Sequence, residues 1–168
     1  MTRPIDDGGA VAWVDEQLAL HTMSRVRPDM ARAGGLVNQA RSHVRSVEMV
    51  VDTDVTFALA GCHDAVRKAI DAHAGAAGLR IENRQGHHQR VLEYAGHHLG
   101  TVISRADLEE ADRLRRRRHS TEYGEIPAGA VTAAEVRSYA ATAARIVDAV
   151  ARSLAGTQPA PPTEGQAG

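Results

Sequence analysis

The sequence predicts an all-α protein, an antiparallel helical bundle of about five helices preceded by a short N-terminal helix. Apolar residues recur at steps of three and four between successive turn signals, which is the spacing of one face of a helix. Alanine, the residue with the highest helix propensity, is abundant. No segment shows the alternation of apolar and polar residues that a half-buried strand requires. The expected connections are short, so consecutive helices should pack antiparallel.

Length and composition predict a single domain that needs no disulfide or metal for stability. The 168 residues are 43% hydrophobic and 24% charged, as in ordinary globular proteins. We expect residues 1–9 to be a flexible N-terminus, residues 10–156 the helical domain and residues 157–168 a disordered tail. The single cysteine, Cys62, lies in a helical apolar pattern that predicts packing in the core. No apolar stretch approaches the ~18 residues of a membrane span, and the acidic N-terminus does not resemble a signal peptide, so we expect a cytoplasmic protein.

Each expected helix is bounded by turn or capping signals. The helices cover residues 10–23, 29–51, 55–74, 87–99, 104–124 and 132–156. Asp54, Ser104 and Thr132 carry side chains that cap helix N-termini, and Asp107 and Glu135 complete capping boxes with the last two. Five side chains of the last two helices are predicted to be largely buried: Leu114, Val136, Tyr139, Ala143 and Val147.

Paired histidines suggest a metal site at first sight, but their spacing argues against one. His87 and His98 share a helix face yet lie about 16 Å apart along the axis. His88 and His97 fall on opposite faces of the same helix, so neither pair can hold one zinc ion. We interpret these side chains as helix-end and surface histidines. No phosphate-binding loop motif is present either, and we expect neither a metal nor a cofactor.

A run of arginines is the strongest local feature of the chain. Five arginines occupy six consecutive positions of one expected helix, and their side chains decorate most of its faces: Arg113, Arg115, Arg116, Arg117 and Arg118. They are the candidate nucleic-acid-binding residues, because the planar guanidinium group suits phosphate oxygens. The alternative is a surface network with acidic residues one turn earlier, among them Glu109, Glu110 and Asp112. The sequence leaves both interpretations open.

Five successive segments give the chain a resemblance to a known family. They are a helix ending near Val51, the segments ALAGCHDAVRKAIDAHAGAAGL, RQGHHQRVLEYA and LRRRRHSTEYG, and a capped final helix. In this order, over roughly residues 30–156, they resemble the HEPN domain, and most closely its small stand-alone actinobacterial branch. HEPN domains are helical bundles of prokaryotic toxin–antitoxin, defence and RNA-processing systems. The resemblance implies an all-helical chain, so a β-sheet of any size would count against it.

The resemblance also implies candidate catalytic residues. Active HEPN ribonucleases carry an arginine, a polar residue next to it, and a histidine four to six intervening residues after the arginine. Arg118 and His119 match the first two positions, but Tyr123, Gly124 and Glu125 occupy the positions expected for the histidine. Histidine suits proton transfer near neutral pH, whereas tyrosine is a poor base because its ordinary pKa is about 10. In the family's metal-free cleavage, Arg118 would stabilise charge at the phosphate, with His119 or Tyr123 beside it.

These observations together predict a HEPN-like module that binds RNA or a nucleotide, in a toxin–antitoxin or defence context, with weak or no catalysis. One alternative is a metal-independent endoribonuclease toxin. Another is a helical adaptor whose arginines bind an acidic protein. The resemblance implies a homodimer, expected to form around residues 55–74 and the helix from Ser104, and an antitoxin or nucleotidyltransferase partner. No membrane partner is expected.

Overall fold

Six helices and a two-stranded ribbon make up the part of the chain that the computed structural model describes, residues 7–124 and 130–157. The elements are α1 (Asp7–Ala19), β1 (Met23–Arg25), α2 (Met30–Val50), α3 (Val55–Ala76), β2 (Leu79–Ile81), α4 (His87–His98), α5 (Arg105–Glu122) and α6 (Ala133–Thr157). The predicted all-α fold class is confirmed. No helix in these residues is both long and apolar enough to cross a bilayer.

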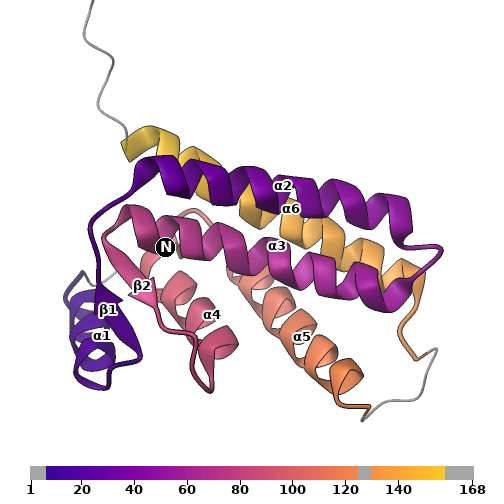
Figure 1. Cartoon of the computed structure of the whole chain (residues 1–168), viewed down its shortest axis with the longest axis horizontal. Helices are drawn as coiled ribbons and strands as arrows, with labels where there is room; N and C mark the ends of the chain where they lie inside the picture. Colours follow the sequence, from indigo (N-terminus) through magenta and orange to yellow (C-terminus); the bar gives the residue numbers. More distant parts are fainter. Residues whose placement is uncertain (1–6, 125–129, 158–168) are drawn as a thin grey trace, which may run out of the picture.

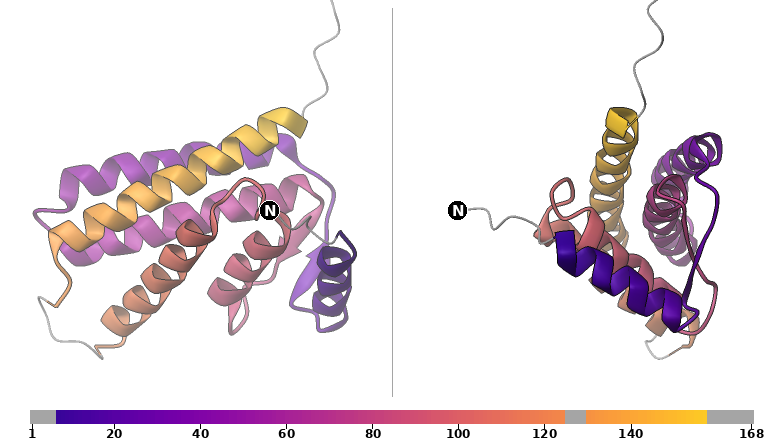
Figure 2. Two further views of the ribbon diagram at one scale, coloured as in Figure 1. Left: turned by 180° about the vertical axis from the view of Figure 1, so that it is seen from behind. Right: turned by 90° about the vertical axis from the view of Figure 1, so that its left-hand side faces the viewer.

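The three longest helices form one layer and the shorter helices lie beneath it. Figure 1 shows α2, α3 and α6 side by side, with α4 and α5 below α3. Among the described helices and strands, the short helix α1 contacts β1 and α4 alone, and it lies across one end of the bundle (Figure 2). Because α3 contacts α2, α4, α5 and α6, it is the central helix on which the other elements are placed.

The predicted N-caps are confirmed, because each capping side chain accepts the expected backbone hydrogen bond. Asp54 Oδ1 accepts from the Phe57 amide at 2.9 Å, and Ser104 Oγ accepts from the Asp107 amide at 3.1 Å. Thr132 Oγ1 accepts from the Glu135 amide at 3.1 Å. These local bonds explain why helix starts were readable from the sequence.

Removing a cap should have a measurable but modest effect. We expect Asp54→Ala to lower the free energy of unfolding by about 1 kcal/mol, because the Phe57 amide loses its only capping acceptor. Urea denaturation followed by circular dichroism would measure this. Thr53→Ala, in the same exposed turn, is the control and should change stability by less than about 0.5 kcal/mol. Equal effects for both variants would contradict the capping role.

The core is mostly aliphatic; α3 and α6 contribute the largest share, and α2, α4, α5 and the ribbon complete it. All five side chains predicted to be buried are at most 6% exposed. Cys62 is also fully buried, as predicted, and burial raises the pKa of its thiol to about 12, which disfavours the thiolate that nucleophilic attack requires. In α2, Ala33 and Val37 face the core, whereas Leu36 and Val44 are only partly buried.

The β-ribbon corrects the expectation that the chain has no strands. β1 and β2 pair antiparallel, with Met23 opposite Ile81 and Arg25 opposite Leu79. The first helix was expected to continue to residue 23, but it ends at Ala19, and a turn with His21 at φ +54° leads into β1. A ribbon of three-residue strands departs from the purely helical chain that the HEPN resemblance implies, and on that criterion it counts against the resemblance.

The outer ends of the bundle also differ slightly from expectation. α1 begins at Asp7, inside the segment expected to be a flexible N-terminus, and α6 continues to Thr157, one residue beyond the expected end. Residues 1–6 and 158–168, for which flexibility and disorder were expected, lie outside the described residues.

Candidate functional site

The arginine run of α5 is paired with carboxylates along its whole length. Each of the five arginines has an acidic partner: Arg113 with Glu110, Arg115 and Arg116 with Asp112, Arg117 with Glu135, and Arg118 with Glu122. Four of the arginines pair with acids of α5 itself, and Arg117 reaches α6 instead. The structure therefore has the arginine–acid network that the sequence left as one of two interpretations. A phosphate would have to compete with these carboxylates for the guanidinium groups.

The three candidate catalytic residues do not form one cluster: Arg118 pairs with Glu122, and His119 contacts Tyr123. Arg118 Nη1 lies 2.9 Å from Glu122 Oε2, one turn farther along the helix. The His119 ring instead contacts the Tyr123 ring, with centroids 4.6 Å apart. Neighbouring helix positions point about 100° apart, which explains why Arg118 and His119 face different directions. Tyr123 is 68% exposed.

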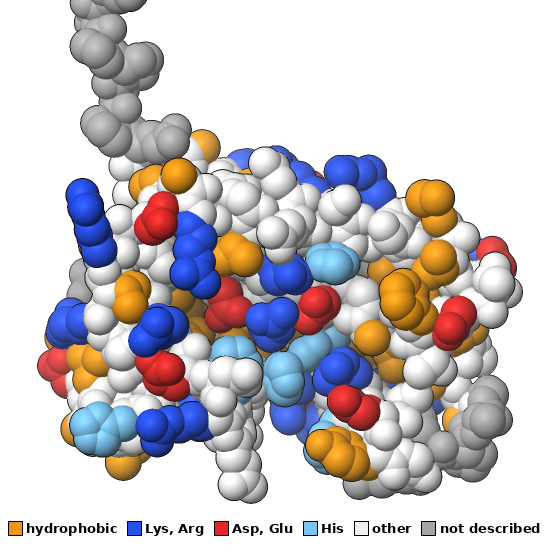
Figure 3. All heavy atoms as spheres, in the orientation of Figure 1, with side chains coloured by type: hydrophobic (Ala, Val, Ile, Leu, Met, Phe, Trp, Pro, Cys, Tyr) orange, Lys and Arg blue, Asp and Glu red, His pale blue; other side chains and the backbone are white. Residues whose placement is uncertain are grey.

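A groove of about 600 Å³ lies where the start of α2, α3, the ribbon and the start of α4 meet, and we call it the α3–α4 groove. It is lined by Val26, Arg27, Asp29, Arg32, Leu36, Asp64, Arg67, Asp71, Leu79, Arg80, Ile81, Asn83, His87 and His88. Figure 3 shows basic, acidic and histidine side chains gathered in the middle of this face, where α3 meets α4 and α5. Sequence reasoning missed this site, because its residues come from four elements.

Arg67 organises the acidic side of the α3–α4 groove. Its guanidinium group lies 3.0 Å from Asp64 Oδ1 and 3.1 Å from Asp71 Oδ2, so one arginine holds two carboxylates. Burial raises the pKa of Asp71, although the charges of His87 and Arg67 oppose the shift. Arg27 and Arg32 line the same groove, are exposed, and form no ion pair within the part of the chain that is described.

Three histidine rings, those of His87, His88 and His63, contact one another in this order, starting at the groove. His87 is buried and its Nδ1–H donates to the Glu82 carbonyl at 3.1 Å; since a carbonyl can only accept, this bond assigns the proton to Nδ1. The His88 ring lies 5.4 Å from that of His87 and 4.7 Å from that of His63. Burial, followed by the charges of His88 and Arg118, lowers the pKa of His63 to about 3. Arg118 is thus the one candidate catalytic residue whose charge acts on this cluster.

The other histidine pair holds α1 against the bundle. Trp13 of α1 stacks on His97, with ring centroids 4.9 Å apart, and Tyr94 stacks on His98 at 4.4 Å. The Tyr94 hydroxyl is 2.9 Å from His73 Nδ1. The paired histidines lie at the two ends of α4, as interpreted from the sequence, but His87 is buried and not on the surface, and His97 and His98 also take part in ring stacking. No group of three metal-ligating side chains converges anywhere in residues 7–124 and 130–157.

Comparisons with protein-family models, with curated proteins and with solved structures gave no match for this chain. The resemblance to HEPN domains therefore stays a prediction that rests on the sequence segments alone.

Proposed function

We propose that the chain binds a phosphate-bearing ligand, an RNA strand or a nucleotide, in the α3–α4 groove. The observation that carries this proposal is that Arg27 and Arg32, two arginines without ion-pair partners among the described residues, line the groove together with the apolar side chains of Leu36, Leu79 and Ile81. Unpaired arginines attract phosphate, and apolar side chains can contact a base. The groove is large enough for a small ligand.

The arginine run of α5 has a secondary part in this proposal. Its five arginines are paired with acids, so a ligand gains less there than at Arg27 and Arg32. Besides burial, the charge of Arg118 helps to lower the pKa values of His63 and His88, but its ion pair with Glu122 offsets part of its attraction for an anion. The remaining arginines suit the adaptor alternative, in which a protein partner offers further carboxylates.

Ribonuclease activity is the alternative enzyme function. Its support is the sequence pattern at Arg118 and His119; its weakness is that Arg118 pairs with Glu122 while His119 contacts Tyr123. We therefore propose binding with weak or no cleavage. An RNA cleavage assay with and without chelator tests this directly, since chelator-resistant cleavage that Arg118→Ala abolishes would establish the endoribonuclease instead.

The proposal retains the biological context that the resemblance implies. A homodimer, an antitoxin or nucleotidyltransferase partner, and a cytoplasmic toxin–antitoxin or defence role all depend on the HEPN resemblance and not on the groove. Sedimentation at tens of micromolar tests the dimer, and a monomer at that concentration would remove it from the proposal.

The groove proposal predicts a selective effect of two substitutions. We expect the double variant Arg27→Ala, Arg32→Ala to bind AMP and a short RNA oligonucleotide about 100-fold more weakly, roughly tenfold for each lost charged contact. Its affinity should also depend less steeply on salt, because fewer phosphates are neutralised. Isothermal titration calorimetry with each ligand would measure both effects.

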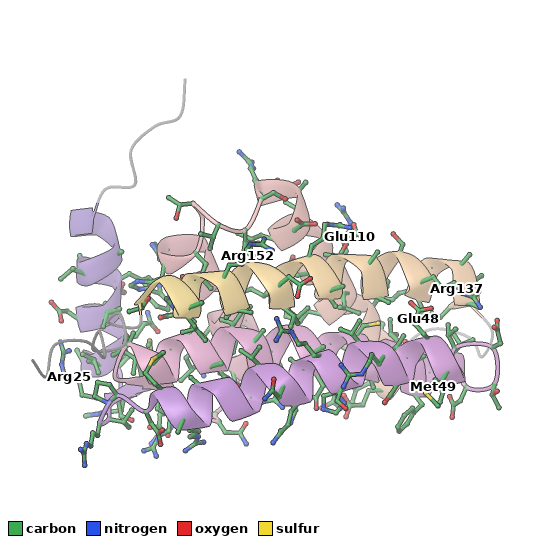
Figure 4. The ribbon with its side chains drawn as sticks, turned by 90° about the horizontal axis from the view of Figure 1, so that it is seen from above. Arg25, Glu48, Met49, Glu110, Arg137 and Arg152 are labelled. Carbon is green, nitrogen blue, oxygen red and sulfur yellow. The ribbon has the colours of Figure 1, made fainter. Side chains whose placement is uncertain are left out.

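Two further double variants make the test specific. Arg45→Ala, Arg152→Ala removes two exposed arginines that also lack ion-pair partners in the described residues but lie outside the groove; Figure 4 shows Arg152 on α6. This control should bind within about twofold of wild type. Arg115→Ala, Arg116→Ala removes two paired arginines of α5. If that variant loses RNA binding and the groove variant keeps it, the proposal for the groove is wrong.

A further inference from the structure

A carboxylate with spare acceptor capacity lines the α3–α4 groove. Asp71 of α3 accepts one side-chain hydrogen bond, from Arg67 Nη1 to its Oδ2 at 3.1 Å. Its Oδ1 has no hydrogen-bond or ion-pair partner in the part of the chain that is described. The side chain is 22% exposed, so water satisfies it only in part. Because each carboxylate oxygen can accept about two hydrogen bonds, Asp71 can still bind a ligand group that donates one.

A nearly buried imidazole beside Asp71 provides a second, independent acceptor. His87 lines the same groove, is 8% exposed, and donates its Nδ1–H to the Glu82 carbonyl at 3.1 Å. In the neutral ring the lone pair then lies on Nε2. Nε2 has no hydrogen-bond or ion-pair partner within residues 7–124 and 130–157. Burial raises the pKa of Asp71, and the charge of His87 is the largest effect that opposes this shift, so the two acceptors are neighbours.

Arg67 fixes the carboxylate in place and has no donor left for a ligand. Its Nε and Nη2 both donate to Asp64 Oδ1, at 3.2 Å and 3.0 Å, while its Nη1 donates to Asp71. The three residues follow one another at steps of three and four along α3, and therefore lie on one face of the helix. Asp71 is thus held in one orientation before a ligand binds, which reduces the entropy that binding costs.

The two acceptors and the two unpaired arginines of the groove require different groups from one ligand. Arg27 and Arg32 donate hydrogen bonds and attract a phosphate, whereas Asp71 repels a phosphate and accepts from an O–H or N–H group. The charge of Arg32 also acts on Asp71, so a phosphate at Arg32 has Asp71 close by. In a nucleotide the group next to the phosphate is the sugar, and a ribose presents two hydroxyls on adjacent carbons.

We propose that Asp71 and His87 form a ribose subsite of the α3–α4 groove, where the carboxylate and the imidazole Nε2 accept hydrogen bonds from the 2′- and 3′-hydroxyls of a ribonucleotide whose 5′-phosphate binds Arg27 and Arg32. This inference rests on the proposed function and specifies its ligand: a ribonucleotide with both hydroxyls free, either a mononucleotide or the 3′-terminal residue of an RNA. It also separates ribonucleotides from deoxyribonucleotides, which the arginines alone do not distinguish.

Deoxy analogues of AMP test the subsite directly. We expect the wild-type protein to bind AMP about tenfold more tightly than 2′-deoxy-AMP or 3′-deoxy-AMP, because each analogue leaves one partly buried acceptor without its donor. IMP should bind within about twofold of AMP, since it keeps the ribose and lacks only the exocyclic amine. Isothermal titration calorimetry measures these ratios. In ¹⁵N-edited spectra of the histidine rings, the Nε2 signal of His87 should shift with AMP and less with one of the deoxy analogues.

Two substitutions remove one acceptor each. Asp71→Ala deletes the carboxylate, and His87→Asn keeps a side-chain N–H for the Glu82 carbonyl while deleting Nε2. Each variant should lose the preference for AMP over one deoxy analogue, with the affinity ratio falling from about ten to about two or less. The ratio is measured within one variant, so neither lost stability nor the freed Nη1 of Arg67 imitates the effect. Asp148→Ala, which removes an exposed, paired carboxylate outside the groove, should keep both ratios.

The same titrations distinguish failure of the subsite from failure of the proposed function. If AMP and both deoxy analogues bind equally and Arg27→Ala, Arg32→Ala weakens all three, the subsite is refuted and the proposed function stands. If 2′- and 3′-deoxy-AMP match AMP while IMP binds more weakly, the acceptors recognise the base amine and the ribose assignment is wrong. If the arginine variant binds AMP like wild type but Asp71→Ala loses the preference for ribose, the subsite is supported and the phosphate assignment fails.

Two RNA tetramers that differ only at the 3′ end identify the source of the ribose. A tetramer with a free 3′-hydroxyl that displaces AMP, while its 3′-phosphorylated form does not, assigns the subsite to an RNA end. If neither tetramer displaces AMP, the ligand is the free nucleotide. Displacement by both tetramers and by the corresponding DNA with equal affinity would show that no free ribose diol is needed, and would overturn the subsite.

Discussion

Val147→Asp should destabilise the protein by several kcal/mol, roughly 4 kcal/mol, because it places a carboxylate in the core without a partner. Val147 is 1% exposed, on the face of α6 that packs against α2 and α3. Two responses are open to the variant: it can keep a buried charge, or it can take up a proton at a raised pKa, and both cost folding energy. Thermal and urea denaturation followed by circular dichroism would measure the loss.

The same substitution at an exposed position of the same helix is the matched control. Ala141→Asp introduces the same side chain on the solvent face of α6. It should cost less than about 1 kcal/mol, mainly through the lower helix propensity of aspartate. If Val147→Asp melts at the wild-type temperature, the packing register of α6 described above is wrong.

Acid should destabilise the protein well above the pH at which ordinary carboxylates titrate. His63 is buried, and its pKa falls from its ordinary value of 6.5 to about 3. The folded state thus prefers the neutral ring, whereas the unfolded chain takes up a proton below pH 6.5. Stability that is fully present above pH 6.5 is therefore lost as the pH falls from 6.5 towards 3. At pH 5 the loss from His63 alone is about 2 kcal/mol.

Other partly buried groups modify this acid dependence with known signs. The pKa values of His73 and His98 are also lowered, first of all by burial, and add to the loss over the interval just below pH 6.5. Asp71 acts in the opposite direction, since burial raises its pKa and the folded state then binds its proton more tightly. Urea midpoints at pH 7.5 and 5 would measure the balance. His63→Gln should reduce the difference between the two pH values by about 2 kcal/mol. An undiminished difference in that variant would exclude His63 as its source.

The parts of the fold that were predicted correctly depend on neighbouring residues. Asp54, Ser104 and Thr132 cap helices by accepting hydrogen bonds from amides three residues later. A sequence pattern of four residues is therefore enough to predict this role. The buried stripe of α6 follows from its 3.6-residue period in the same way. Burial of Cys62 followed from the corresponding pattern in α3.

The parts that were missed depend on residues far apart in the chain. The ribbon joins segments far apart in the chain: Ser24 Oγ donates a hydrogen bond to Glu82, 58 positions later. Neither three-residue strand is long enough to show an alternating pattern of apolar and polar residues. The α3–α4 groove combines residues of four elements and has no motif. The capping-box pattern at Glu135 was half correct: its amide is capped by Thr132, but its carboxylate pairs with Arg117 of α5, which no local pattern indicates.

The candidate site shows the same limit for side-chain direction. The sequence placed Arg118, His119 and Tyr123 close together along the chain, and they are close. Their chemistry depends on orientation: Arg118 forms an ion pair with Glu122, whereas His119 contacts Tyr123. The catalytic pattern considers only the spacing of Arg118, His119 and the expected histidine, so it could not predict that Glu122 would pair with Arg118.

The pairing of the two strands of the ribbon during folding also affects ligand binding in the α3–α4 groove. α2 and α3 are joined by a short turn and pack against each other, so they can pair early at little cost in chain entropy. The two strands of the ribbon lie on either side of α2 and α3 in the chain. Val26 and Arg27, which follow β1, therefore meet Leu79 to Ile81 of β2 only when β1 and β2 pair. A partly folded chain with its helices formed but its ribbon open thus lacks one wall of the groove. Any ligand that spans both walls selects the closed chain and raises its population by mass action, without touching the core of the bundle.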